Sequence, residues 1–216
     1  MVNEALALIL GYLLGSIPAA YIVTRIVKGK DIRQMGGGNI GGLNVYREVG
    51  AIPAALASIV DIGKGAAAVA IALWLLKVDT PFVLLAGLIS VVGHNWMVFL
   101  KFSGGKGMGT TFGALLVLLP FYGYPEGLAI LFGTIIIPFI ITRNVALSMG
   151  TGLLSLPFIT WLGINSGIGI IISVIVDIMI GLKFLPTAKA ALAKSKTKKD
   201  FIFDRVQRDK GKRGEI

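Results

Sequence analysis

The chain contains no cysteine, a single histidine and few charged residues. The lack of cysteine excludes disulfides and thiolate metal sites, and one histidine leaves little material for a zinc site. Only 15% of the 216 residues are charged, whereas 55% are hydrophobic and the mean hydropathy is +0.83. A soluble domain of this length needs charge spread over its surface. The composition therefore excludes a soluble domain and predicts an all-α integral membrane protein.

Long apolar runs separated by short polar breaks predict about seven transmembrane helices, because a helix that crosses the hydrocarbon core needs about 20 apolar residues. The predicted spans cover residues 4–27, 51–76, 81–100, 109–122, 127–141, 145–163 and 167–184. The fourth and fifth are short and share a turn with proline and glycine, so a single hairpin is the alternative there. The first span has no basic residues before it and no clear cleavage site, so we expect it to be retained.

The basic residues predict the orientation, because Lys and Arg collect in the cytoplasmic loops of membrane proteins. They cluster at 25–47, at 101–106, at Arg143 and at 183–213, and the last of these segments holds more than half of them. Lys77 is in a loop on the opposite predicted side of the membrane. Seven spans then place the N-terminus outside and the C-terminus in the cytoplasm.

We expect a membrane domain over residues 1–188 and a basic cytoplasmic tail over residues 189–216. The net charge of +10 raises the question of nucleic acid. A basic tail next to a membrane helix instead favours anionic lipid headgroups, so membrane lipid is the expected partner and nucleic acid is not.

Two glycine-rich loops on the predicted cytoplasmic side are unusual for simple connectors. The first contains Gly36, Gly37, Gly38, Asn39, Gly41, Asn44 and Arg47, and the second contains Gly104, Gly105, Lys106 and Gly107. Glycine lets backbone amides converge on an anion, and Lys or Arg neutralises its charge. The loops predict a site for a phosphate-bearing ligand, with flexible connectors that face lipid as the alternative.

The second loop does not match a nucleotide P-loop. The first glycine of that motif would fall at Leu100, and Gly107 stands where Ser or Thr is required. The pattern therefore argues against ATP hydrolysis.

Several ionisable residues lie within predicted spans, where they are costly unless they serve a purpose. Asp61 and Lys64 are three residues apart and share one helix face. They are interpreted either as a supporting polar pair of the site or as an ion pair that holds the bundle together. Asp177 has no partner that the sequence identifies. His94, two turns inside the end of the third predicted helix, is a candidate base or phosphate ligand, or a packing histidine.

Together these segments resemble the bacterial membrane acyl-phosphate:glycerol-3-phosphate acyltransferases. The resembling residues follow in order at 15–18, 31–33, 36–39, 41–44, 47, 50, 61–65, 93–94 and 99–107. The resemblance implies transfer of a fatty acyl group from acyl phosphate to the 1-hydroxyl of glycerol-3-phosphate, which gives lysophosphatidic acid and phosphate in the first step of phospholipid synthesis. It also implies the bacterial inner (plasma) membrane, an active site on the cytoplasmic side, and no cofactor or metal.

The resemblance suggests roles for the loop residues. Arg47 and Lys106 are expected to bind the substrate phosphates together with the glycine amides, while Asn39 and Asn44 shape the first loop or bind hydroxyls. His94 completes the catalytic candidates.

The chain also departs from the family pattern. Gly37 stands where a serine is usual, and a third motif with histidine and asparagine after the last span has no counterpart at 183–216. These departures motivate an alternative: a non-catalytic paralogue that binds phospholipid precursors or partners the true acyltransferase.

Overall fold

The computed structural model describes residues 1–194, and these are helical apart from turns and one isolated β-bridge between Met97 and Ser103. The chain forms two compact units, unit 1 at Met1–Gly123 and unit 2 at Tyr124–Ile216. The predicted all-α class is confirmed. From residue 195 on, the predicted basic tail lies outside the described residues.

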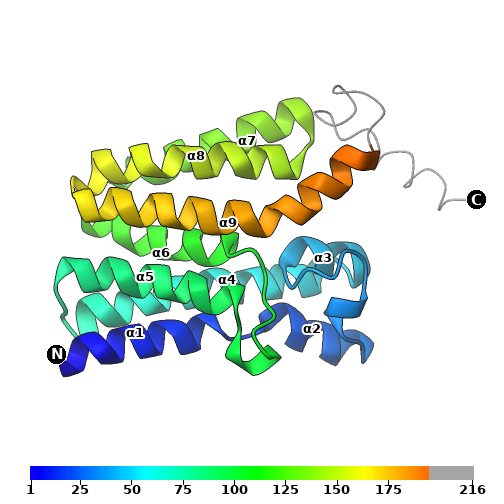
Figure 1. Ribbon diagram of the computed structural model, residues 1–216, viewed down its shortest axis with the longest axis horizontal. Helices are drawn as coiled ribbons and strands as arrows, with labels where there is room; N and C mark the ends of the chain where they lie inside the picture. Colours follow the sequence, from blue (N-terminus) through cyan, green and yellow to red (C-terminus); the bar gives the residue numbers. More distant parts are fainter. Residues whose placement is uncertain (195–216) are drawn as a thin grey trace, which may run out of the picture. The chain divides into compact units, whose positions relative to one another are not determined.

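Unit 1 contains six α-helices and three short helical turns (Figure 1). They are α1 (Val2–Gly15), α2 (Ala19–Lys28), η1 (Ile32–Gln34), α3 (Gly42–Glu48), α4 (Ala51–Ala70), η2 (Ile71–Leu75), α5 (Thr80–Asn95), η3 (Val98–Leu100) and α6 (Met108–Phe121). Unit 2 contains α7 (Glu126–Thr142), α8 (Val145–Ile164) and α9 (Gly167–Lys194).

Among the described residues, four apolar helical segments are long enough to cross a membrane: Val2–Lys28, Ala51–Leu75, Leu147–Ile164 and Gly167–Lys189. Three shorter apolar helices are α5, α6 and α7. Each of the seven predicted spans therefore has an apolar helical counterpart, and the lengths support a multi-pass membrane protein.

The first predicted span is broken where a continuous helix was expected. α1 ends at Gly15 and α2 begins at Ala19, because Pro18 has no amide hydrogen to continue the helical ladder. At this break the Ile17 carbonyl oxygen accepts a hydrogen bond from Lys64 Nζ of α4 at 2.9 Å. A backbone irregularity at membrane depth is thus satisfied by a side chain.

The third predicted span ends early, at Asn95 rather than at residue 100. The chain turns there because Met97 and Leu100 enter an apolar cluster with Ile32 and Ile40 of the α2–α4 connection. Phe102 N donates to the Met97 carbonyl at 2.9 Å and closes the turn. The prediction that His94 lies two turns inside the helix end was therefore wrong: His94 is in the last turn of α5.

Glycines bring the helices of unit 1 into backbone contact. A Cβ at Gly15 of α1 would meet the Ser90 carbonyl of α5, and one at Gly113 of α6 would meet the Ile62 carbonyl of α4. Lipid supplies no hydrophobic drive for helix association, so small residues that permit close backbone approach stabilise the pairing. These contacts hold α1 against α5 and α4 against α6.

Unit 2 uses hydroxyl groups between its helices. Thr151 Oγ1 donates to the Thr134 carbonyl at 2.6 Å, and the Thr134 and Ser155 hydroxyls lie 3.1 Å apart, which joins α7 to α8. Thr160 Oγ1 donates to Ser173 Oγ at 3.1 Å and joins α8 to α9. Interhelical hydrogen bonds of this kind stabilise helix pairs in lipid modestly.

Candidate anion site formed by two loops

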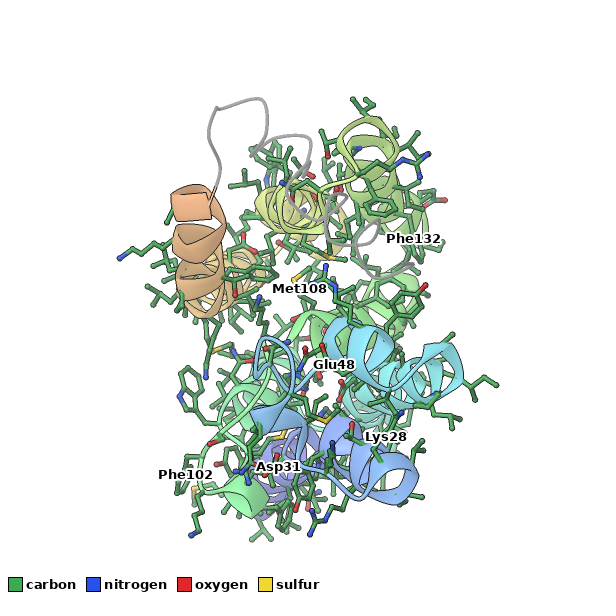
Figure 2. The ribbon with its side chains drawn as sticks, turned by 90° about the vertical axis from the view of Figure 1, so that its right-hand side faces the viewer. Lys28, Asp31, Glu48, Phe102, Met108 and Phe132 are labelled. Carbon is green, nitrogen blue, oxygen red and sulfur yellow. The ribbon has the colours of Figure 1, made fainter. Side chains whose placement is uncertain are left out.

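The two glycine-rich loops lie at the same end of unit 1, because both α2 and α5 end there (Figure 1). Loop one comprises residues 29–50, between α2 and α4, and loop two comprises residues 96–107, between α5 and α6. Figure 2 faces this end and labels Lys28, Asp31 and Glu48 in or beside loop one, with Phe102 in loop two and Met108 directly after it. The structure thus brings together segments that are far apart in the sequence.

A buried apolar cluster anchors the two loops to each other. Ile32 and Ile40 of loop one and Met97 and Leu100 of loop two belong to it and are fully or nearly fully buried. Full burial of one such side chain contributes about 1.5–3 kcal/mol. Hydrophobic packing of these side chains therefore holds the two loops against each other.

Gly105 marks the point where the loops touch. Its amide donates to the His94 carbonyl at 3.0 Å, and a Cβ at this position would meet both His94 Nε2 and the Ile40 carbonyl. Any larger residue must displace one of these groups, so the approach of loop one, loop two and α5 requires glycine here.

Lys106 and Arg47 place two positive charges at this junction. Lys106 is half-buried, and burial, with a further contribution from the nearby Arg47 guanidinium, lowers the pKa of its amine to about 8. Arg47 is exposed on α3. Two cations close enough to lower a pKa are both stabilised by an anion, so the charge pattern suits a phosphate.

Asn44 organises the backbone of loop one. Its side-chain amide donates to the carbonyls of Ile32, Met35 and Asn39 at 3.4, 3.1 and 3.1 Å, while its Oδ1 accepts from the Gly37 amide at 3.2 Å. The side chain is buried and its bonds converge on the turn at residues 32–39. Asn44 therefore stabilises the backbone conformation of loop one through these hydrogen bonds.

Other loop-one residues lie nearer the surface. Asn39 is half-buried and its side-chain nitrogen lies beside Gly41, while Gly36 and Gly37 are exposed. Gly38 has a left-handed backbone (φ +69°), which helps the chain return toward α3. The predicted loop-one glycines thus form the outer edge of the junction.

Arg33 is paired within loop one. Its guanidinium bonds both carboxylate oxygens of Asp31, with a shortest distance of 2.6 Å, and lies 5.6 Å from the ring centre of Tyr21. The hydrogen bond from Arg33 holds the pKa of the Asp31 carboxyl below its ordinary value. This pair shapes the loop rather than adding charge to the junction.

Asp61, Lys64 and His94 form a buried group directly beneath the loops. Asp61 Oδ1 lies 2.7 Å from Lys64 Nζ and 3.4 Å from His94 Nδ1. Their exposed fractions are 5%, 3% and 3%. The sequence predicted the Asp61–Lys64 pair from its helical spacing but missed the contact with His94, because only the packing of α4 on α5 creates it.

The first turn of α6 extends the site beyond the residues that the sequence singled out. Gly107 begins the helix with a left-handed backbone (φ +87°) and has no side chain to cap the first amides. Within the described part of the chain, the buried Thr110 and Thr111 hydroxyl oxygens have no hydrogen-bond partner. Because α6 begins directly after Lys106 and Gly107, the positive end of its dipole points toward Lys106 and the junction.

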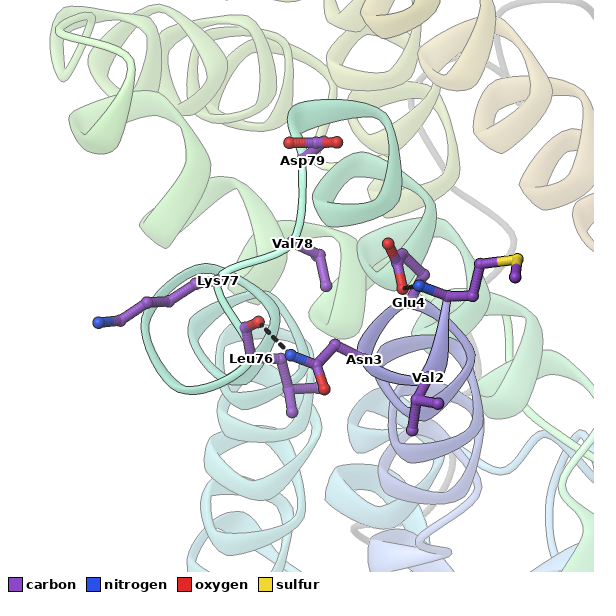
Figure 3. A pocket seen from close by; sticks show the side chains of 8 residues that line it. Val2, Asn3, Glu4, Leu76, Lys77, Val78 and Asp79 are labelled. Carbon is purple, nitrogen blue, oxygen red and sulfur yellow. Dashed lines mark hydrogen bonds and ion pairs between the residues drawn. The ribbon is translucent and has the colours of Figure 1, made fainter.

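The opposite end of unit 1 differs in character. A pocket of about 300 Å³ lies there between the start of α1 and the α4–α5 connection (Figure 3). Asn3 Nδ2 donates to the Leu76 carbonyl at 3.1 Å across it, and its charged lining includes Glu4, Lys77 and Asp79. Among residues 1–194, no group of three or more His, Asp or Glu side chains gathers at either end to hold a metal.

Known proteins similar to this chain were found by sequence and by structure. A family model described as glycerol-3-phosphate acyltransferase matches residues 5–194. Glycerol-3-phosphate acyltransferase 1 of Dehalococcoides mccartyi is 48% identical over 203 residues, which cover 94% of this chain and 98% of that protein.

Two crystal structures of PlsY (YgiH), an integral membrane glycerol 3-phosphate acyltransferase, are similar in fold. The glycerol 3-phosphate form has a TM-score of 0.80 at 27% identity, and the lysophosphatidic acid form has 0.75 at 26%. Each comparison covers 88% of this chain and 92% of the other.

Proposed function

The chain belongs to the glycerol-3-phosphate acyltransferase family, as its motifs led us to expect, and from this premise we propose that it transfers a fatty acyl group from acyl phosphate to the 1-hydroxyl of glycerol-3-phosphate. An ester bond forms to the glycerol oxygen, the acyl–phosphate bond breaks, and the hydroxyl proton leaves with phosphate. The products are lysophosphatidic acid and phosphate.

The convergence of two amide-rich, cationic loops at one end of unit 1 is the observation that carries this proposal. Both substrates bear phosphate, and acyl phosphate is already activated. The protein then has mainly to orient two anions and to stabilise the charge that develops at the tetrahedral centre. No cofactor is needed for this chemistry.

We assign Lys106 and Arg47 to the substrate phosphates. The half-buried Lys106 amine supplies a charge that solvent screens weakly, and the exposed guanidinium of Arg47 can engage phosphate through two parallel hydrogen bonds. The amides of Gly104, Lys106 and Gly107 and the first turn of α6 add donors for phosphate oxygens, whereas the Gly105 amide is already bonded to the His94 carbonyl.

The remaining predicted residues have supporting parts in this proposal. Asn44 holds loop one in shape, and Asn39 lies where it can reach a substrate hydroxyl. His94 Nε2 faces the Gly105 backbone, which puts the imidazole at the floor of the junction rather than in open solvent. A buried imidazole there suits a proton acceptor or a ligand for phosphate.

We further propose that all seven apolar segments span the bacterial inner membrane, with the N-terminus outside. Within unit 1 the loop end carries most of the basic residues and the opposite end carries Lys77, as expected when the loop end faces the cytoplasm. The membrane domain then covers residues 1–188, and the basic tail at 189–216 follows it toward anionic lipid.

The activity is testable with purified protein in lipid nanodiscs, supplied with palmitoyl phosphate and glycerol-3-phosphate. We expect phosphate release that depends on the acceptor, together with lysophosphatidic acid detected by mass spectrometry. Release that requires a different phosphorylated acceptor would correct the substrate, and folded protein that turns over no acceptor would overturn the proposal.

A non-catalytic paralogue is not favoured. The chain is 48% identical over 94% of its length to a named acyltransferase, and it keeps the two cationic loops in contact. The glycine at position 37 leaves loop one intact, because its amide is bonded by Asn44 and a Cβ there would meet nothing within 4 Å.

A further inference from the structure

Asp61 lies between two buried nitrogens that belong to different helices. Its Oδ1 is 2.7 Å from Lys64 Nζ on α4 and 3.4 Å from His94 Nδ1 on α5. The other ring nitrogen of His94, Nε2, faces Gly105 of loop two. The His94 imidazole therefore lies between the Asp61 carboxylate and the backbone of loop two at Gly105.

We propose that Asp61 is a positioning residue, which keeps a proton on Nδ1 of His94 and fixes the imidazole beneath Gly105. In this way Asp61 sets the shape of the loop-two backbone. The inference rests on the proposed function, because it takes loop two to be a phosphate site.

The chemistry of the imidazole supports this role. A carboxylate beside one ring nitrogen favours a proton on that nitrogen, and the choice of protonated nitrogen follows from its hydrogen-bond partner. His94 and Asp61 are both nearly fully buried, so water does not weaken the interaction. On its other edge the ring meets Gly105 and lies near the Ile40 carbonyl, which restricts rotation.

The competing interpretation is a structural ion pair, in which Asp61 serves only to neutralise Lys64. Lys64 Nζ also donates to the Ile17 carbonyl at the α1–α2 break, so the pair clearly contributes to packing. Removal of one partner would leave an uncompensated buried charge and destabilise the protein. A useful test must therefore separate the loss of the ion pair from the loss of the histidine contact.

Two variants make this separation. Lys64→Met removes the ion pair but leaves the Asp61 carboxylate beside His94. The double variant Asp61→Leu/Lys64→Met removes both charges with residues of similar size, and it also removes the carboxylate that lies beside Nδ1. Asp79→Asn is the matched control, because Asp79 is exposed at the opposite end of unit 1.

The first readout is the protonation of His94 itself. The chain has one histidine, so protein labelled with ¹⁵N-histidine gives signals from one imidazole only. We expect a protonated Nδ1 in the unmodified protein, in Lys64→Met and in the Asp79→Asn control, and an unprotonated Nδ1 in the double variant. An unprotonated Nδ1 in the unmodified protein would overturn the proposal, and that measurement needs no variant to fold.

The second readout is the KM for glycerol-3-phosphate at saturating palmitoyl phosphate. Loss of a residue that orients a metal-binding histidine typically costs about 10–100-fold in affinity or activity. On the same scale, we expect the KM of the double variant to rise at least about tenfold over that of Lys64→Met. A purely structural role would lower the amount of folded enzyme, and hence kcat, at an unchanged KM. An unchanged KM with Nδ1 still protonated in the double variant would reject the positioning role.

These outcomes are distinguishable from failure of the proposed function. If the unmodified protein transfers no acyl group, the enzymatic proposal fails, whereas the ¹⁵N signals still report whether Asp61 sets the protonation of His94. Binding of glycerol-3-phosphate by the inactive protein then replaces KM as the second readout.

Discussion

Unit 1 and unit 2 accommodate polar groups among apolar helices in different ways. Unit 1 buries Asp61, Lys64 and His94 together beneath two cationic loops, whereas the described helices of unit 2 are joined by hydroxyl contacts such as Thr160 to Ser173. Ionisable groups at membrane depth are costly and usually serve function, while hydroxyl contacts mainly stabilise helix packing. The comparison supports our proposal that the catalytic site lies in unit 1.

Asp177 is an exception to this comparison, because it is an ionisable residue within an apolar helix of unit 2. Its Oδ1 is buried and has no hydrogen-bond partner in the described part of the chain. It lies four residues after Ser173 and so shares a face of α9 with the contact to Thr160. The four predictions that follow test the division between the units, beginning with the largest effect.

Loss of the Lys106 charge is expected to have the greatest effect. Removal of one preorganised group that stabilises developing charge costs about 100–1000-fold in rate, so Lys106→Ala should lower kcat/KM for glycerol-3-phosphate by at least about 100-fold. Lys77→Ala, at the opposite end of unit 1, is the matched control and should stay within about twofold. Comparable losses in both variants would contradict a localised anion site.

Gly105→Ala should be the next most damaging change. The added methyl group would meet His94 Nε2 and the Ile40 carbonyl, so the two loops must separate. Overpacking of this kind costs about 1–3 kcal/mol, and we expect kcat/KM to fall by about 10–100-fold.

Gly37→Ala is the control for Gly105→Ala, since a Cβ at Gly37 would meet nothing within 4 Å. We expect this variant to retain full activity in the same assay. If the two alanines had equal effects, the contact between the loops could not be the cause.

The pH dependence should follow the Lys106 amine. Its pKa is lowered to about 8, so the amine is charged below this pH and loses its charge as the pH rises through it. At pH 9 roughly a tenth of the free enzyme keeps the cation, and kcat/KM, which reports the free enzyme, should be about tenfold lower than at pH 7. Lys106→Arg should abolish this descent, because arginine stays charged; a descent that persists in that variant would assign the titration to another group.

The smallest effect is expected in unit 2. Thr160→Val removes the bond to Ser173 and should destabilise the protein by about 0.6 kcal/mol, the average for interhelical hydrogen bonds in a membrane. Thermal unfolding in detergent measures this loss, and acyl transfer should be unchanged. A large loss of activity without a loss of stability would show that unit 2 takes part in the chemistry.

Periodicity and composition were sufficient to predict the apolar segments and the two loops, because each is a local pattern, but they did not predict the break between α1 and α2 or the short helix α3. The positions of Asp61 and Lys64 on one helix face also followed from local spacing. The turn at residues 96–102 was not predictable in the same way. Its apolar residues continue the hydrophobic run of α5, and only the packing of Met97 and Leu100 against loop one shows that they leave the helix.

Contacts between distant segments were beyond prediction from one sequence. The approach of His94 to Asp61 depends on how α4 packs against α5, and nothing in the sequence of either helix indicates which residues of the other it will meet. The resemblance to a family suggested candidate residues but not which of their atoms are in contact. Thr110 and Thr111 follow the glycines of loop two in the sequence, but nothing in the local pattern assigned them a role; their hydroxyl oxygens, buried and unpartnered among the described residues, are visible only in the structure.

The interruption between α1 and α2 shows how a residue without any polar side-chain atom can govern the location of a charge. Pro18 interrupts the helix between α1 and α2, and the Ile17 carbonyl is therefore available to accept a hydrogen bond from the Lys64 ammonium group. Replacement of Pro18 by a residue with an amide hydrogen would let the helix continue through the break, so that the Ile17 carbonyl could accept from the Tyr21 amide and an oxygen would be lost from the shell around the cation. The ionic centre of unit 1 thus depends on a proline at the break between α1 and α2, 46 positions before Lys64 in the chain.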